Sequence, residues 1–256
     1  MMTRNQLPKF VVEHPVTTAI ILTVAWHAVL FLIAAVLPPL SFDWFPELGA
    51  SIINAILFAL TVWLILVWRF ARESGIGRPR PERAWWLVAP LLVISVSYGF
   101  PRLEGTPAQF VSTAVLCVFV GASEETLSRG LIQGILRPIG PYRTAILVGI
   151  LFGLGHALSG LWFNRPIDDV AWQVLSTAIF GFCLAAVRFH LTTIWPLVLV
   201  HAADDFFMLR SPGAAPWWME IVTFPFYIGF GILLIRVWKR QESTRERTGL
   251  PHRTQG

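Results

Sequence analysis

Long apolar segments dominate this 256-residue chain and restrict its fold more than any other feature. A helix needs about 20 mostly apolar residues to cross a bilayer, and a spanning helix satisfies its own backbone hydrogen bonds. Charged residues make up only 14% of the sequence, against about a quarter in an average soluble domain. We therefore predict an all-α, polytopic transmembrane helix bundle of about eight spans, at roughly 16–37, 49–70, 85–101, 107–126 (continuing as helix to about 136), 143–160, 170–189, 193–209 and 216–238.

The distribution of basic residues predicts the orientation of this bundle. If the N-terminus is cytoplasmic, every Lys and Arg except Arg102, Arg165 and Arg210 lies on the cytoplasmic side, as the positive-inside rule requires. We expect an N-in, C-in, multi-pass protein of the cell membrane, with membrane lipids and no nucleic acid among its partners. Its expected parts are a cytoplasmic N-terminal tail (1–14), a transmembrane helical domain (15–238) and a basic cytoplasmic tail (239–256).

Two adjacent carboxylates, Glu124 and Glu125, interrupt the fourth apolar segment. Carboxylates at membrane depth are costly, and they usually mark functional sites. Arg129 follows Glu125 by four residues, which is the favourable order for an ion pair on one helix face. Glu124 points about 100° away around the helix, so it lacks a local partner and is a candidate general base. The segment alone also fits a structural ion pair, with Glu124 paired to another helix.

The fifth and seventh segments each carry a histidine with a partner four residues away. Phe152 and His156 share one helix face, and the glycines between them allow a neighbouring helix to approach closely. His201 and Asp205 also share a face, and a histidine oriented by an aspartate suits acid–base chemistry or metal ligation. Taken singly, either pair also fits ordinary packing or a helix end.

The depths of these groups suggest that they meet. Glu124 lies about 16 residues below the outer end of its span, and His156 about 13 residues above the inner end of its own, which places both near the centre of the bilayer at about 1.5 Å per residue. His201 lies nearer the cytoplasmic side. We expect the three to converge around a cavity that opens to the cytoplasmic face. His27, on the first span, has no acidic neighbour in the sequence, and we expect it to serve in packing.

In order, these motifs resemble those of the CPBP family, the CAAX protease and bacteriocin-processing proteins, also called Abi. Members are intramembrane metalloproteases related to the type II CAAX prenyl endopeptidases. The family pattern is Glu-Glu-x-x-x-Arg, then Phe-x-x-x-His, then His-x-x-x-Asn or Asp, on successive membrane helices. The matching residues are Glu124, Glu125 and Arg129, then Phe152 and His156, then His201 and Asp205, and the resemblance covers roughly residues 85–210.

The resemblance implies an intramembrane endopeptidase that hydrolyses a peptide bond of a membrane-associated or lipidated protein or peptide. Glu124 and His156 would activate a water, and His201 and Asp205 would stabilise the oxyanion or help to hold a metal. Glu125 and Arg129 would form a structural ion pair. The expected organism is bacterial, with the protein in the cytoplasmic membrane.

Zinc is an implied cofactor of this family, and its possible ligands are Glu124, His156 and His201. A metal-free, glutamate-dependent mechanism is the alternative. Many relatives carry Asn where this chain has Asp205, and an ionised Asp cannot donate a hydrogen bond to an oxyanion. Asp205 is therefore protonated, or it orients His201, or it favours a metal-centred site.

A non-enzymatic function competes with the protease hypothesis. Buried Glu, His and Asp side chains also build proton or solute paths, and an inactive bacteriocin-immunity scaffold would keep the same helices. Transporters more often show internal repeats and helices broken by Pro or Gly in both halves, and the sequence shows neither.

Overall fold

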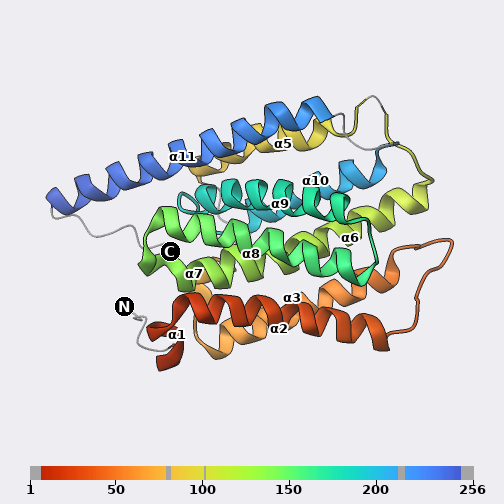
Figure 1. The fold of residues 1–256 in the computed structure, drawn as a ribbon, viewed down its shortest axis with the longest axis horizontal. Helices are drawn as coiled ribbons and strands as arrows, with labels where there is room; N and C mark the ends of the chain where they lie inside the picture. The colour runs from red at the N-terminus through yellow and green to blue at the C-terminus, as the bar shows by residue number, and fades with distance from the viewer. Residues whose placement is uncertain (1–6, 79–81, 101, 213–216, 249–256) are drawn as a thin grey trace.

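The computed structural model describes residues 7–78, 82–100, 102–212 and 217–248, and the described residues form a bundle of helices without a β-sheet (Figure 1). Successive long helices run in alternating directions along the bundle. Their bounds are α1 Lys9–Glu13, α2 Pro15–Val36, α3 Leu48–Val67, α4 Ala71–Ser74, η2 Arg83–Val88, α5 Ala89–Ser97, α6 Pro107–Glu125, η3 Thr126–Ile132, α7 Gln133–Leu136, η4 Arg137–Ile139, α8 Pro141–Trp162, α9 Ile167–Arg188, α10 Trp195–Arg210 and α11 Trp217–Arg247.

The predicted class, an all-α polytopic bundle, is confirmed. Among the described residues, six helical segments are long and apolar enough to cross a membrane. They are α2, α3, the continuous stretch from α6 to η4, α8, α9 and α11. Two further helical segments pack within the bundle: η2 with α5 is short, and α10 has 16 residues that include His201 and two aspartates. The count of eight spans stays a prediction.

Two predicted segments have different bounds in the structure. The third, expected at 85–101, is a 3₁₀ turn over Arg83–Val88 followed by an α-helix over Ala89–Ser97, and the α-helix begins where Pro90 fixes the backbone. The last helix continues to Arg247, into the segment expected to be a tail. Glu, Arg, Lys and Gln are strong helix formers, so a charged sequence prolongs the helix beyond its apolar part.

The helix with the two glutamates is continuous but changes its geometry beside them. Its N-terminus carries a capping box in which Thr106 and Gln109 bond each other's backbone, with Pro107 in the first turn. After Glu125 the backbone adopts a π-helical stretch, Thr126–Ile132, before it returns to α. Such stretches are rare and occur often at functional sites.

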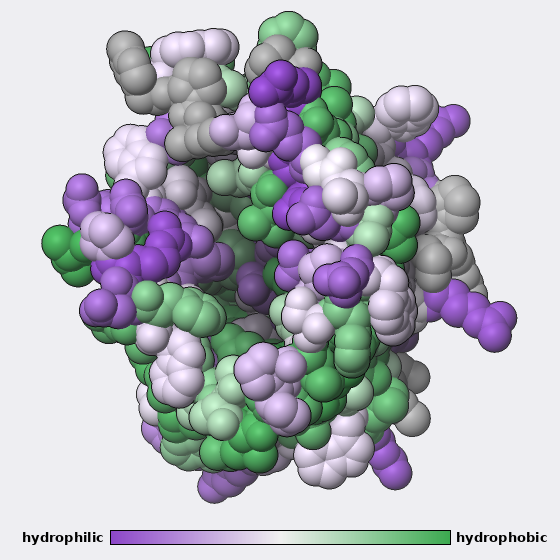
Figure 2. All heavy atoms as spheres, turned by 90° about the vertical axis from the view of Figure 1, so that its right-hand side faces the viewer, coloured by the Kyte–Doolittle hydropathy of each residue, from purple (hydrophilic) through white to green (hydrophobic). Residues whose placement is uncertain are grey.

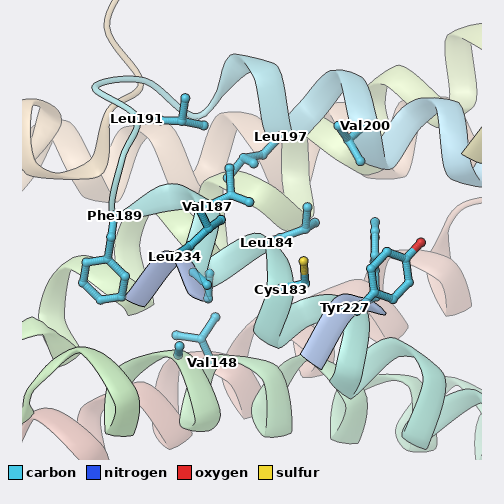
Figure 3. Packing of buried hydrophobic residues seen from close by; sticks show 14 of the residues in the cluster. Val148, Cys183, Leu184, Val187, Phe189, Leu191, Leu197, Val200, Tyr227 and Leu234 are labelled. Carbon is cyan, nitrogen blue, oxygen red and sulfur yellow. The ribbon is translucent and has the colours of Figure 1, made fainter. Parts of the chain in front are cut away.

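Helix α9 lies at the centre of the hydrophobic core (Figure 3). The glycines of α8 allow the closest approach: a Cβ atom at Gly153 would lie 2.5 Å from the carbonyl oxygen of Val174. Side chains from four helices form this core, with Val148 from α8, Cys183, Leu184 and Val187 from α9, Leu197 and Val200 from α10, and Tyr227 and Leu234 from α11.

Hydrogen bonds close the end of the bundle where α9 turns into α10. The carbonyl oxygen of Gly75 accepts from the backbone N–H of Ile194 and from the hydroxyl of Thr193, both at 3.0 Å. Arg188 donates to the Leu191 carbonyl at 2.6 Å and braces the turn itself. The segment after α4 therefore covers the α9–α10 turn from outside.

Cysteine labelling tests the predicted orientation. The two native cysteines, Cys117 and Cys183, are buried and should stay unlabelled. Asp168 and Gln241 are exposed at opposite ends of the bundle. With both termini cytoplasmic, a membrane-impermeant maleimide should label an Asp168→Cys variant in intact cells and a Gln241→Cys variant only after lysis. The reverse pattern would contradict the N-in topology.

Candidate functional site

The carboxylate of Glu125 connects two buried side chains, those of Arg129 and His201, inside the bundle. Arg129 Nη1 lies 2.7 Å from Glu125 Oε1, the contact that the four-residue spacing predicts, and both side chains are fully buried. His201 Nδ1 lies 2.9 Å from the same oxygen. The expected ion pair is therefore part of a three-residue network, which joins the π stretch to α10.

His201 has three carboxylates around its ring. Its Nδ1–H donates to Glu125, while its Nε2 lies 3.5 Å from Asp205 Oδ2 and 3.8 Å from Glu124 Oε2. The edges of Phe152 and Phe180 face the ring at centroid distances of 5.7 and 6.3 Å. Of the three interpretations of Asp205, this geometry favours the one in which the aspartate orients His201.

Arg129 is held by more than its carboxylate partner. Its guanidinium lies 4.3 Å above the ring of Phe152, and its Nη2 donates to the carbonyl of Gly181 at 3.2 Å. A cation over an aromatic face gains further stabilisation in a desolvated site. The phenylalanine of the second motif thus supports the arginine of the first.

A close approach of two helices sets Glu124 beside His201. A Cβ atom at Gly121 would lie 2.9 Å from the Val198 carbonyl oxygen, so any larger residue would separate α6 from α10. Glu124 follows one turn later, and its side chain keeps 21% of its surface exposed, whereas that of Glu125 keeps none. Only Glu124 of the pair remains accessible.

His156 presents one nitrogen to the site. Its Nδ1 lies 3.0 Å from the Phe152 carbonyl, one turn earlier on α8, so the neutral ring keeps its proton on Nδ1. The lone pair of Nε2 is then free to accept a hydrogen bond. His156 shares a cavity wall with Glu124 on one side and with His201 on the other.

A cavity of about 650 Å³ adjoins these residues. His156, His201 and Asp205 line its inner part, and Arg165 and Glu220 line its outer part. Figure 2 views the bundle from this end and shows the hollow, with hydrophilic side chains in its depth. The cavity therefore extends toward the end that carries the α8–α9 connection and the start of α11.

The expectation of a cavity open to the cytoplasmic face conflicts with this direction. The α8–α9 connection, at residues 163–166, lies at the end opposite the α9–α10 turn, and under the N-in topology that end is not cytoplasmic. The α9–α10 end is closed by the bonds to Gly75. The predicted topology and the predicted opening cannot both hold, and on the N-in topology the opening was wrong.

His27 lies at the site although the sequence pattern assigned it to packing. Its Nδ1 lies 2.8 Å from the Thr23 carbonyl, and its Nε2 lies against α8, 2.5 Å from where a Cβ atom at Gly155 would be. It lines a second, smaller cavity with Glu124 and His156. The sequence indicated this role only through the presence of a histidine in a membrane span. The groups beside it at the site, Glu124 and His156, lie on other helices and cannot be found from sequence spacing.

The arrangement of donors does not fit a zinc ion as it stands. One nitrogen of His201 is committed to Glu125, and among the described residues no group of three or more His, Cys, Asp or Glu side chains is placed to hold a metal ion. Zinc bound by Glu124, His156 and His201 stays a prediction.

Comparison with known proteins agrees with the motif analysis. Residues 106–207 match the family model described as type II CAAX prenyl endopeptidase Rce1-like. No curated protein and no solved structure matches the chain. The matched range includes the two glutamates, both motif histidines, and the residues between them.

Loss of Arg129 should destabilise the fold. An Arg129→Met variant leaves the Glu125 carboxylate buried without its cation, and breaking a buried pair in this way costs about 3 kcal/mol. The measurement is thermal unfolding in detergent. Arg102→Met is the matched control, because its ion pair with Glu104 is mostly exposed and should contribute little. Equal unfolding temperatures for both variants would contradict the structural role of the pair.

Proposed function

We propose that this chain is an intramembrane endopeptidase with Glu124 as its general base, as the match of residues 106–207 to the type II CAAX prenyl endopeptidase Rce1-like family supports. The supporting observation is the convergence of the three motifs. Glu124 comes from α6, His201 and Asp205 come from α10, and His201 Nε2 lies 3.8 Å from Glu124 Oε2 and 3.5 Å from Asp205 Oδ2. His156 joins them from a third helix.

In the proposed first step Glu124 activates a water. The carboxylate takes one proton as the water oxygen forms a bond to the scissile carbonyl carbon. His156 Nε2 accepts a hydrogen bond from the same water and orients it. The protonated Glu124 then gives its proton to the leaving amine nitrogen when the carbon–nitrogen bond breaks. This assignment rests on the accessibility of Glu124, since Glu125 is fully enclosed.

His201 is the group proposed to stabilise the oxyanion. Glu125 holds its Nδ1–H, so a second proton on Nε2 would point toward the large cavity beside Asp205. A fixed donor in a water-poor site stabilises developing negative charge strongly. Asp205 orients the imidazole, and its carboxylate stabilises the positive charge of the protonated ring. The Nε2–H of His201 then takes the place of the donor that an asparagine supplies in relatives.

The substrate is proposed to be a membrane-associated or lipidated protein or peptide, bound in the large cavity. That cavity has Phe152, Phe180 and Phe224 among its apolar lining and charged side chains at its outer end. An extended peptide segment can therefore bring its scissile bond to His156 and His201. We place the protein in the bacterial cytoplasmic membrane, where a processed precursor peptide or membrane protein is the expected substrate.

Substitutions at the site test the endopeptidase activity. Purified protein is incubated with quenched fluorescent membrane peptides, and Glu124→Gln should lower kcat by about 10²- to 10⁴-fold, the usual contribution of a general base. His156→Ala and His201→Ala should also lose most activity. Glu104→Gln, an exposed residue away from the cavity, should retain it. Cleavage that survives Glu124→Gln would refute the proposed base.

Metal removal tests the alternative mechanism. If no metal takes part, dialysis against a chelator should leave the rate unchanged, and elemental analysis should find less than one zinc per ten chains or so. A rate that falls on chelation and returns with zinc would establish the metal-dependent form. His201→Ala would then also lower the zinc content, which measures ligation apart from catalysis.

A further inference from the structure

The smaller cavity between α2, the π stretch and α8 is not explained by substrate binding. Its volume is about 40 Å³. A buried water needs a cavity of roughly 10–15 Å³ and at least two polar partners. Trp26, His27, Glu124 and His156 are among its lining residues. It is thus large enough for water and too small for a large peptide side chain.

One of the lining residues carries an unpaired donor. The indole nitrogen of Trp26 is fully buried, and among the described residues it has no hydrogen-bond acceptor. A buried indole N–H usually finds a partner, and a buried group without a protein partner is commonly satisfied by an ordered water. Trp26 therefore supplies an observation independent of the cavity volume.

His27 supplies a matching acceptor. Its Nδ1 donates to the Thr23 carbonyl at 2.8 Å, which leaves the Nε2 of the neutral ring with a lone pair. The absence of a side chain at Gly155 allows that nitrogen to lie directly against α8 beside His156. A water there would accept from Trp26 and donate to His27 and Glu124.

We propose that this small cavity binds the nucleophilic water, and that Trp26 and His27 are positioning residues for it. The inference rests on the proposed endopeptidase function. Glu124 takes one proton of the water, and His27 Nε2 shares the other with His156 Nε2 in a three-centre hydrogen bond, so the remaining oxygen lone pair is directed toward the substrate. Phe152 and His156 belong to the walls of both cavities, so water and peptide meet across them.

Two near-isosteric substitutions test the roles of these residues. His27→Phe keeps a ring but removes the acceptor, and Trp26→Phe removes the donor. Each should lower kcat about tenfold, as expected for one hydrogen bond of about 1.4 kcal/mol, with KM changed less than about twofold. His27→Gln restores an acceptor at a similar reach and should recover most of kcat.

His14→Phe is the matched control, because that histidine is exposed outside the cavity and should retain wild-type kinetics. Thermal unfolding confirms that each variant is folded. Unchanged kcat in His27→Phe would overturn the proposal. So would a His27→Gln variant as slow as His27→Phe, because the ring would then serve only in packing.

A second measurement does not depend on activity. X-ray radiolysis in membranes generates hydroxyl radicals from bound water, and mass spectrometry then finds the side chains oxidised beside it. Trp26 should be oxidised in the wild type and several-fold less in His27→Phe. Absence of Trp26 oxidation in the wild type would overturn the water site even if peptides are cleaved. Oxidation of Trp26 without any peptide cleavage would instead retain the water site and refute the endopeptidase function.

Discussion

The shared carboxylate of Glu125 is the interaction on which the rest of the site depends. One oxygen accepts hydrogen bonds from Arg129 and from His201, and all three side chains are buried. Desolvating such charges costs several kcal/mol for each ion, and close geometry with further hydrogen bonds is needed to offset that cost. The hydrogen bond from Arg129 to the Gly181 carbonyl and the contact of its guanidinium with the Phe152 ring offset part of this cost. They connect α6, α8, α9 and α10 at one depth.

This network also determines which glutamate remains for chemistry. Oε1 of Glu125 holds both partners, and the whole side chain is fully buried, so no cavity in the described part of the chain gives a water access to this carboxylate. The side chain of Glu124 keeps 21% of its surface exposed, and its Oε2 lies 3.8 Å from His201 Nε2, which is longer than a hydrogen bond. The adjacent residues thus divide into one that fixes the imidazole and one that lines a cavity, because neighbouring side chains on an α-helix point about 100° apart.

The sequence was sufficient for features that depend on short spacing. The apolar segments predicted the helix class, and the four-residue step predicted the Glu125–Arg129 contact. It could not predict the bond between His201 and Glu125, which are 76 residues apart. On the N-in topology, the direction of the cavity was missed for a related reason. Depth counting places residues along a span, whereas the closure at Gly75 depends on loop packing.

The position of His27 shows why a polar residue in a span should be judged by its neighbours on other helices. Nothing near it in the sequence is acidic, and its importance arises from Gly155 on α8, where a side chain would occupy the place of the ring. A hydrolase inside a bilayer must bring water to a site from which lipid excludes it. Under the proposed function, the two cavities that share Phe152 and His156 would meet this requirement, with a water in the smaller one beside His27 and Glu124 and the peptide in the larger one.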